Sequence, residues 1–542
     1  MKHIKKLASL LLVLVMVFAL ATTAFAEETT YSITINNSTA GHTYEAYQIF
    51  TGDLATTAFA EETAYSITIN NSAKDHTYEA YQIFTGDLSG TTLSNIVWGS
   101  GVSEAGQTAL GDAAAKAETL KTEADAKAFA KAVAPYLTTA AGSANTVTDG
   151  KYIISGLAAG YYLVKDQDGS LTGDADAYTE YIIRVVSDTT ATPKSSVPTV
   201  EKKVKDTNDS TGVTSDWQDS ADYDIGDSIP FQLKATLANN VSSYTTYKVV
   251  FHDTLSKGLT YNNDAKVYIG GTETNGFTVT ATVNADGTTT LTVSCDDVKA
   301  LGAGNSSVIT VEYTVKLNEN AVLGSAGNPN EVYLEYSNNP NKSENGNNET
   351  GETPKDVVIV FTYKAIINKV DSENAPLTGA AFKLEKLIKG KDGAAGTWTT
   401  VKEFTVDETT TSFTFSGLDD GQYKLTETKT PAGYNTIDPI YFVIEATHDV
   451  TADAPTLKTL NAYLTDANGN KQTEMKDGES VNIDLGTVDL TAGSITTTVV
   501  NKSGAQLPET GGIGTTIFYV LGGVLVLAAV VLLVTKKRMG NT

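Results

Sequence analysis

The chain contains very little cysteine and histidine. Its 542 residues include one cysteine, Cys295, which cannot form an internal disulfide bond. Of its five histidines, His42 and His76 occupy equivalent places in two copies of one segment, and His3 lies near the start of the chain. The histidines form no pattern typical of a catalytic triad or a metal cluster. We therefore predict no enzymatic turnover, no cofactor and no bound metal.

The chain also has fewer basic residues than acidic ones. The chain has 39 lysine and arginine residues against 64 aspartate and glutamate residues, a formal charge of −25. Such a charge repels phosphate backbones, so we predict no nucleic-acid partner and read the acidic balance as a contribution to solubility. The length allows several separate hydrophobic cores.

The first residues have the three parts of a secretion signal. Lys2, Lys5 and Lys6 precede an apolar run from Leu7 to Leu20, and Ala24-Phe25-Ala26 offers a small-residue cleavage site. This order predicts a signal peptide over residues 1–26, with cleavage after Ala26.

The last residues predict an anchor. Ile517 to Val534 is an apolar stretch long enough to span a membrane, and Lys536, Lys537 and Arg538 follow it. Ahead of the stretch lies LPETG, formed by Leu507, Pro508, Glu509, Thr510 and Gly511. This order, over 504–542, resembles the sorting signal of Gram-positive surface proteins. The resemblance implies that a sortase attacks the Thr510–Gly511 bond and fixes the secreted protein to the cell wall.

A long segment is repeated directly. Residues Ala21 to Leu54 recur almost unchanged as Ala55 to Leu88, and the copy includes the cleavage site. A structural repeat has no reason to contain a cleavage site, so we interpret segment 27–60 as a recent duplication or an assembly artefact rather than part of a solenoid. In an alternative reading, the spare strand Tyr31 to Asn36 pairs with the sheet edge of another molecule.

Most of the remaining sequence alternates apolar and polar residues, as in YSITIN, YKVVF, ITVEYTV and TSFTF, between Gly, Asn, Asp and Thr clusters. This period of two predicts an all-β protein of tandem immunoglobulin-like sandwiches in an elongated rod. The Ala-, Lys- and Glu-rich stretch Glu104 to Leu137 predicts one or two helices inserted in the first domain. Proline-containing linkers predict domains at 61–198, 199–356 and 357–503.

In the third predicted domain, three polar residues extend apolar strand faces. Burial of a lysine and a carboxyl group favours their neutral forms. A neutral amine held against an amide carbonyl, with a protonated acid beside it, can attack that carbonyl and expel ammonia. The pattern indicates a Lys–Asn isopeptide bond, and the alternative is a buried ion pair with a hydrogen-bonded asparagine. The three strand faces read Ala365, Ile367, Lys369; Tyr423, Leu425, Glu427; and Ile495, Val499, Asn501.

The motifs of this region resemble a Cna B-type domain of Gram-positive surface proteins. They are NKVD, PLTGAAFKL, GQYKLTETKTPAGY and an asparagine shortly before LPETG, over about 359–503. The resemblance implies that Lys369 and Asn501 form the bond and that Glu427 is the intramolecular acid.

The second predicted domain repeats the pattern. Alternation in PTVEKKVKD selects Lys202, while YKVVFHDTL and GNPNEVYLEY place Asp253 and Asn330 on apolar faces. These segments, over about 199–345, resemble the fimbrial isopeptide-forming domain of backbone pilins, in which an aspartate takes the acid's role. If a bulge shifts the alternation, Lys203 becomes the donor and Asn338 or Asn339 the acceptor.

The first predicted domain has only part of this pattern. GLAAGYYLVKD places Asp166 where the acid would lie, but the opening strand YSITIN holds no lysine, so we predict no isopeptide bond there. The acidic loop 166–176 lacks the closing glutamate of an EF-hand, which favours a solvated loop over a calcium site.

One lysine stands out in the linker TPKSSVPT. Lys194, between Pro193 and Pro198, lies in a segment too polar and proline-rich for a core. It resembles the pilin-motif lysine of backbone pilins, although Thr192 replaces the usual aromatic residue. The alternative is an ordinary linker lysine.

These features predict the major subunit of a covalent pilus. Sortase would join Thr510 of one subunit to Lys194 of the next, a head-to-tail contact that yields a filament. The resemblance implies as partners a class C-type pilin sortase, a housekeeping sortase, identical subunits, peptidoglycan, and tip and basal pilins. The alternative function is a monomeric wall-anchored adhesin.

Overall fold

The structure, a computed structural model, describes residues 64–74, 76–171, 177–193, 196–343, 349–390 and 395–504. The predicted signal peptide, the duplicated segment, Lys194, the LPETG motif and the apolar stretch 517–534 lie outside the described residues. Within the described ranges, no helix is both long enough and apolar enough to cross a membrane.

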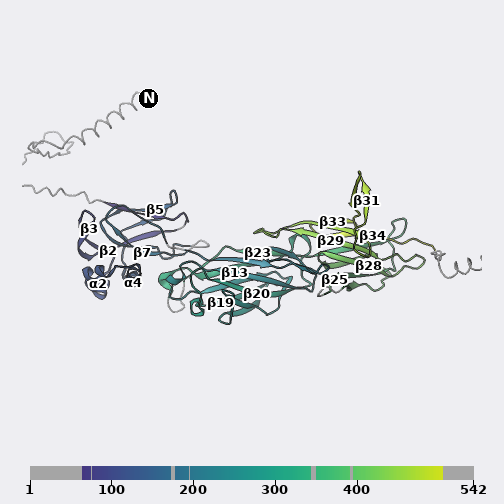
Figure 1. Ribbon diagram of the computed structural model, residues 1–542, viewed down its shortest axis with the longest axis horizontal. Helices are drawn as coiled ribbons and strands as arrows, with labels where there is room; N and C mark the ends of the chain where they lie inside the picture. The colour runs from purple at the N-terminus through teal and green to yellow at the C-terminus, as the bar shows by residue number, and fades with distance from the viewer. Residues whose placement is uncertain are drawn as a thin grey trace, which may run out of the picture. The chain divides into compact units, whose positions relative to one another are not determined.

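Strands dominate every part of the described chain, which confirms the all-β prediction (Figure 1). The first β domain contains a three-stranded sheet, ordered β5-β1-β8, and a five-stranded sheet, ordered β3-β2-β6-β7 with β4 against β2. Its strands are β1 Tyr65–Asn70, β2 Tyr78–Ser89, β3 Thr92–Trp98, β4 Gly142–Ala144, β5 Lys151–Leu157, β6 Gly160–Asp166, β7 Glu180–Val185 and β8 Thr189–Ala191.

Strand β2 is buried on both faces. Tyr78 and Ala80 pack with Ile67 in a core that joins the two sheets, because the YSITIN strand points alternate isoleucines inward. On the opposite face of β2, Ile83 packs against Phe129 in a second core. The helical insertion therefore covers the outer face of the five-stranded sheet.

The helical insertion is confirmed, but it forms three short α-helices instead of one or two. They are α2 Glu104–Leu110, α3 Ala113–Thr119 and α4 Glu123–Val133, followed by the 3₁₀ turn η1 Ala134–Tyr136. Gly111 takes a φ of 87° and ends α2. The side chains of Asp112 and Thr122 then cap the next two helices by accepting backbone N–H groups.

The second β domain is a sandwich of two larger sheets. One is ordered β12-β23-β21-β14-β19-β18, with β22 against β21, and the other β17-β16-β20-β13-β9, with β15 against β20. Its elements are β9 Thr199–Val204, β10 Thr207–Asn208, β11 Val213–Thr214, β12 Ser220–Asp222, β13 Ser228–Thr236, η2 Val241–Ser243, β14 Val249–Leu255, β15 Leu259–Tyr261, β16 Lys266–Ile269, β17 Thr272–Thr274, β18 Thr278–Val283, β19 Thr289–Cys295, η3 Val298–Leu301, β20 Val308–Leu317, η4 Gly324–Ala326, β21 Asn328–Ser337, η5 Pro340–Lys342, β22 Thr350–Glu352 and β23 Asp356–Phe361.

The third β domain pairs the sheet β27-β24-β34-β33 with the sheet β26-β25-β28-β29-β30, and the hairpin β31–β32 projects from it (Figure 1). Its strands are β24 Tyr363–Val370, β25 Ala381–Ile388, β26 Thr397–Glu403, β27 Ser412–Leu418, β28 Gly421–Lys429, β29 Ile440–His448, β30 Leu457–Thr465, β31 Thr473–Lys476, β32 Glu479–Asn482, β33 Thr487–Asp489 and β34 Ser494–Val500.

The second and third domains meet closely. Strand β23 pairs with β12 and β21 of the second domain, and the chain passes from it to β24 of the third after a single residue, Thr362. Gly324 and Gly493 lie against each other across this junction, where a Cβ on Gly324 would come within 2.3 Å of the Thr491 carbonyl oxygen. The short connection and the close backbone contact hold the two domains against each other.

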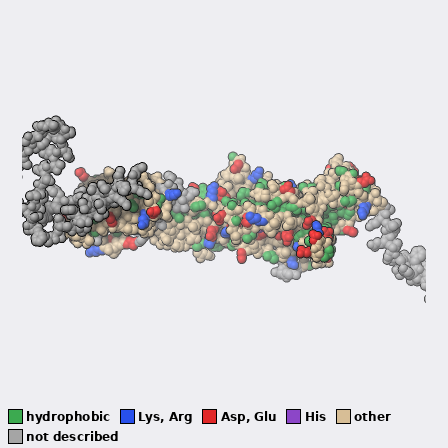
Figure 2. Space-filling model, turned by 90° about the horizontal axis from the view of Figure 1, so that it is seen from above, with side chains coloured by type: hydrophobic (Ala, Val, Ile, Leu, Met, Phe, Trp, Pro, Cys, Tyr) green, Lys and Arg blue, Asp and Glu red, His purple; other side chains and the backbone are tan. Residues whose placement is uncertain are grey.

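On the face drawn in Figure 2, acidic and basic side chains are scattered among hydrophobic and other side chains. The only cysteine, Cys295, is buried as a free thiol.

Candidate functional site

In the second domain, the structure brings Lys202, Asp253 and Asn330 together in the core. Lys202 projects from β9 in one sheet, and Asp253 and Asn330 project from the neighbouring strands β14 and β21 in the other. All three side chains are fully buried. The alternation of each strand predicted these orientations, because each polar residue continues an apolar face.

A tyrosine completes the group. Lys202 Nζ donates to Asp253 Oδ1 at 2.6 Å and to the Tyr313 hydroxyl oxygen at 2.9 Å. The Tyr313 hydroxyl donates to the other oxygen of Asp253 and accepts from Asn330 Nδ2 at 2.9 Å. Tyr313 therefore links the acid to the amide. The sequence motifs did not indicate Tyr313, although it occupies an inward position in the alternating strand ITVEYTV.

The electrostatics favour neutral groups. Burial lowers the pKa of Lys202, against the opposing effect of the Asp253 carboxylate, and burial raises the pKa of Asp253. Burial and the Asp253 charge raise the pKa of Tyr313 far above its usual range, which keeps its hydroxyl a donor. Burial therefore shifts the amine and the acid of this hydrogen-bonded group toward their neutral forms, beside the Asn330 amide.

The alternative residues lie elsewhere. Strand β9 pairs with β13 from Thr199 to Val204 without a bulge, and Lys203 points the other way and pairs with Asp219. Asn338 and Asn339 follow the end of β21, where Asn339 Nδ2 donates to Glu349 at 2.8 Å. The structure brings none of these three to the Lys202 group.

In the third domain, Lys369, Glu427 and Asn501 are also buried together. Lys369 lies on β24 opposite Val499 of the parallel strand β34, and Asn501 directly follows β34. Glu427 comes from β28 in the facing sheet. The first and last strands of the domain thus carry the amine and the amide side by side.

The acid contacts the amide directly. Asn501 Nδ2 donates to Glu427 Oε2 at 3.1 Å and to the Asn435 carbonyl oxygen at 3.0 Å, while Lys369 Nζ donates to the Val499 carbonyl oxygen at 2.9 Å. Burial lowers the pKa of Lys369, and the Glu427 charge opposes that shift. Among the described residues, Glu427 Oε1 and Asn501 Oδ1 are buried without a hydrogen-bond partner. Unsatisfied buried polar atoms are costly and call for an explanation.

The first domain has a different arrangement at the corresponding acid. Asp166 is buried, but it lies 2.7 Å from His76 Nδ1 and accepts from the backbone and hydroxyl of Thr179 at 2.9 and 3.0 Å. A histidine and a threonine therefore occupy the surroundings of Asp166 in place of a lysine. Residues 172–176 of the acidic loop lie outside the described part of the chain.

Two further polar clusters lie where the second domain meets the third. In one, Lys386 forms ion pairs with Asp209 at 3.1 Å, with Asp224 at 2.7 Å and with Asp419. In the other, His448 faces Asp206 and Asp222, with spacing suited to a metal ion. Burial works against the charged imidazole, but the two carboxylates raise the pKa of His448 to about 9. The sequence did not indicate either cluster, because its members are distant in the chain.

The fold and the sorting signal together define a class of protein, namely a surface protein of tandem β-sandwiches with a cell-wall anchor. Residues 364–458 match the SpaA prealbumin-like fold domain, and 225–340 match the Cna-B-like domain of Gram-positive pilin backbone subunit 2. Residues 499–539 match the LPXTG cell wall anchor motif. These matches agree with the resemblance to Gram-positive backbone pilins with an LPXTG anchor that the sequence motifs predicted, and the anchor motif supports a location on the cell wall.

Individual proteins are also similar to this chain. The trypsin-resistant surface T6 protein of Streptococcus pyogenes serotype M6 is 26% identical over 407 residues, covering 64% of this chain and 70% of the relative. The structure of the T6 backbone pilin of that serotype matches with a TM-score of 0.52 and 19% identity, over 82% of this chain and 99% of the other. The full-length major pilin SpaD of Corynebacterium diphtheriae matches with a TM-score of 0.46 and 19% identity, over 82% and 98% of the two chains.

Proposed function

We propose that this protein is the major structural subunit of a pilus whose subunits are joined covalently and whose second and third domains each close a Lys–Asn isopeptide bond. The observation that carries the proposal is the pair of buried groups, Lys202 with Asp253 and Asn330, and Lys369 with Glu427 and Asn501. Such a bond needs two reactants and an acid. In each group the buried lysine with its lowered pKa and the asparagine amide are the reactants, and the aspartate or glutamate is the acid.

The reaction needs no external reagent. The neutral Nζ of the lysine attacks the side-chain carbonyl carbon of the asparagine, while the protonated acid donates a hydrogen bond to the carbonyl oxygen. The tetrahedral intermediate expels the amide nitrogen, which leaves as ammonia after taking up the proton lost by the amine. One C–N bond forms and one breaks, and the acid ends as it began.

The two bonds would have different mechanical roles. The bond in the second domain would join one sheet of the sandwich to the other, because Lys202 and Asn330 lie on different sheets. The bond in the third domain would join the first strand, β24, to the residue after the last, β34. Each replaces a disulfide, which a chain with one cysteine cannot form within itself.

Subunit joining would use the sorting signal. A class C-type pilin sortase would cleave between Thr510 and Gly511 and transfer the Thr510 carbonyl to the amine of Lys194 on the next subunit. A housekeeping sortase would attach the finished fibre to peptidoglycan, and tip and basal pilins would complete it. The LPXTG match and the backbone-pilin match support a sortase substrate that polymerises.

Polymerisation is tested by expressing the protein with its sortase and boiling the cell-wall extract in detergent. The wild type should give a ladder of high-molecular-weight bands, and a Lys194→Ala variant should give only monomer. Lys266→Ala, which removes an exposed lysine of the second domain, is the matched control and should keep the ladder. A ladder from the Lys194→Ala variant would overturn the choice of lysine, and no ladder from the wild type would favour the monomeric adhesin.

A further inference from the structure

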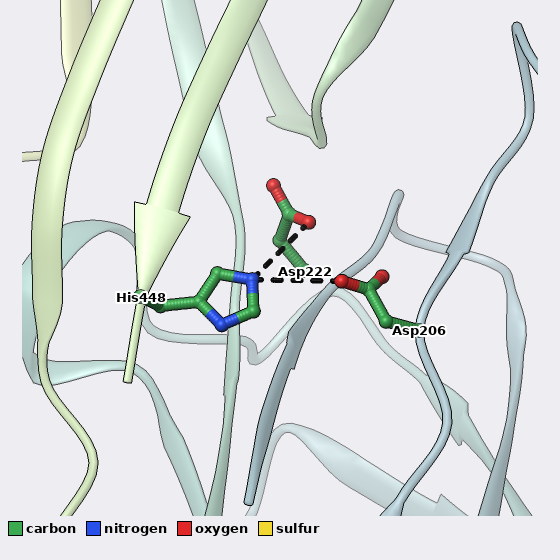
Figure 3. Close-up of side chains that lie close together, drawn as sticks. All are labelled: Asp206, Asp222 and His448. Atoms are coloured by element: carbon green, nitrogen blue, oxygen red, sulfur yellow. Dashed lines mark ion pairs between the residues drawn. The ribbon is translucent and has the colours of Figure 1, made fainter. Parts of the chain in front are cut away.

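Three side chains from two domains converge at the junction of the second and third domains (Figure 3). Asp206 follows β9 and Asp222 ends β12, both in the second domain, while His448 ends β29 in the third. His448 Nε2 lies 3.5 Å from Asp206 Oδ2 and 3.9 Å from Asp222 Oδ1. The group is largely shielded from solvent, since Asp222 is 2% exposed and the His448 side chain 7%.

A serine sets the orientation of the imidazole ring. Ser220 Oγ lies 2.7 Å from His448 Nδ1 and also donates to the Asp449 carbonyl oxygen. A carbonyl oxygen can only accept, so the single hydroxyl proton of Ser220 points at Asp449, and Ser220 Oγ must accept from Nδ1–H. In the neutral ring, Nε2 then carries the lone pair, and it faces the two carboxylates. Metal-ligating histidines are commonly held in this way through their other nitrogen.

The spacing suits a shared cation better than direct hydrogen bonds. An N–H···O hydrogen bond is usually about 2.7–3.2 Å long, and both distances from Nε2 exceed that range. Ligands placed about 2.0–2.2 Å from a tetrahedral Zn²⁺ lie roughly 3.3–3.6 Å from one another. The three ligand atoms lie within 4.8 Å of one another, so small side-chain movements bring all three to a central ion.

The local charge is also unbalanced. Among the described residues, no lysine or arginine forms an ion pair with Asp206 or Asp222, whereas Lys386 pairs with three aspartates in the neighbouring cluster. The other oxygen of Asp222 accepts from the Asp420 backbone N–H at 3.2 Å, which leaves Oδ1 directed at His448. Burying carboxylates is costly unless a cation offsets their charge, and here that cation is either a metal ion or a protonated His448.

The Tyr363 hydroxyl lies beside the same group. Tyr363 is fully buried, and burial together with the charge and hydrogen bonding of Asp222 raises the pKa of its hydroxyl far above the usual range. The hydroxyl therefore stays protonated and is directed at the Asp222 carboxylate.

We propose that Asp206, Asp222 and His448 form a binding site for a divalent transition metal, best matched by Zn²⁺, that ties the second domain to the third. One imidazole nitrogen and two carboxylates suit Zn²⁺, while Ca²⁺ and Mg²⁺ prefer sets of oxygen ligands. Because the ligands come from both domains, bound metal stabilises their contact. The competing occupant is a proton on Nε2, which would leave an imidazolium between the carboxylates.

The test uses the full chain without an affinity tag, purified in detergent, stripped with a chelator and dialysed against Zn²⁺. Metal content is measured by mass spectrometry, and the thermal unfolding midpoint is measured with and without Zn²⁺. The variants are His448→Gln and Asp222→Asn. The control is His252→Gln, because His252 also faces a carboxylate, Glu335 at 2.9 Å, but within the second domain alone. Circular dichroism checks that each variant is folded.

The wild type and His252→Gln should each bind one Zn²⁺ per chain more than His448→Gln and Asp222→Asn. Zn²⁺ should raise the unfolding midpoint of the wild type and His252→Gln only. Co²⁺ should give visible absorption bands in the wild type that His448→Gln removes. Equal Zn²⁺ content in the wild type and His448→Gln would overturn the proposal. A wild type that takes up no Zn²⁺ would also overturn it and would favour the proton.

Discussion

Lys202 Nζ lies 2.6 Å from Asp253 Oδ1, and neither side chain is exposed to solvent. An ion pair buried this deeply usually contributes little stability, because desolvation offsets the attraction between the charges. Burial instead shifts both groups toward their neutral forms. A covalent amide would remove the buried ionisable amine of Lys202, and the Asn330 side-chain oxygen, which has no hydrogen-bond partner among the described residues, would remain as the carbonyl oxygen of the new bond.

The two isopeptide bonds should form independently. Asp253→Asn should lose only the bond in the second domain, and Glu427→Gln only the bond in the third, because each acid acts within its own core. Intact mass should show two ammonia molecules lost from the wild type and one from each variant. By the chain-entropy estimate for a cross-link that closes a loop of about 100 residues, each missing bond should cost about 4.7 kcal/mol of unfolding free energy.

Asp264→Asn is the matched control for this experiment, because Asp264 accepts only from Thr314 at the surface. It should lose two ammonia molecules like the wild type. A Glu427→Gln protein that still loses two would contradict the role of Glu427.

Tyr313→Phe should slow bond formation in the second domain without abolishing it. The hydroxyl contacts all three reacting groups, and its loss leaves the Asp253 carboxyl and the Asn330 amide each without one partner. An unmet buried hydrogen bond costs about 1–3 kcal/mol, and about 1.4 kcal/mol on the barrier slows a reaction tenfold. The mass of freshly expressed protein should therefore show a mixture that loses the second ammonia with time.

Tyr261→Phe serves as the comparison, because Tyr261 stacks edge-on against Tyr313 but donates to none of the reacting groups. If both variants complete the bond as fast as the wild type, Tyr313 has only a packing role.

Lys386→Met should weaken the junction strongly. Its ammonium pairs with Asp209 and Asp224 of the second domain and with Asp419 of the third, and its side chain is 1% exposed. Removal of one partner from a buried ion pair typically costs about 3–5 kcal/mol, because the remaining charges stay buried. Urea unfolding should show this loss.

Lys383→Met, on the same strand, is the control. Lys383 pairs with Glu385 at 3.1 Å at the partly exposed surface, where ion pairs contribute about 0–1 kcal/mol. Equal losses in the two variants would show that the Lys386 cluster adds little to stability.

Asp227 should make stability depend on pH. Burial, aided by the charges of Asp224 and Asp209 and opposed by Lys386, raises its pKa to about 6 in the folded protein from a usual value of 3.8. A raised folded-state pKa gives stability that is fully present below the unfolded pKa and is lost as pH rises through the folded one. The free energy of unfolding of Asp227→Asn, relative to that of the wild type, should therefore increase as the pH rises from 4 to 6. The difference should reach a value on the order of 1–2 kcal/mol by pH 7.

Asp407→Asn should behave in the opposite way. Hydrogen bonds from Thr409 and Thr410 lower the pKa of the exposed Asp407, so its contribution is present at neutral pH and is lost in acid. Urea midpoints measured from pH 4 to 7 compare both variants with the wild type. A constant difference for Asp227→Asn across this range would contradict the raised pKa.

The inward faces of the strands could be predicted from local alternation alone. Lys202, Asp253, Asn330, Lys369 and Asn501 all lie on the predicted faces and are buried, because side chains alternate strictly along a strand that forms no bulge. The helical insertion was predicted less well. Gly111 and the capping residues Asp112 and Thr122 divide it into three helices, and the overall composition of the segment does not contain these local stop and start signals.

The amino-acid sequence by itself determined the class of protein, the strand pattern and which lysine, acid and asparagine residues lie together in the cores of the second and third domains. Only the tertiary structure placed Tyr313 between acid and amide, because that contact crosses from one sheet to the other. It likewise decided that His448 of the third domain meets Asp206 and Asp222 of the second. The alternation of apolar and polar residues indicates which side of a strand is buried. Contacts between sheets and between domains depend instead on how whole surfaces pack.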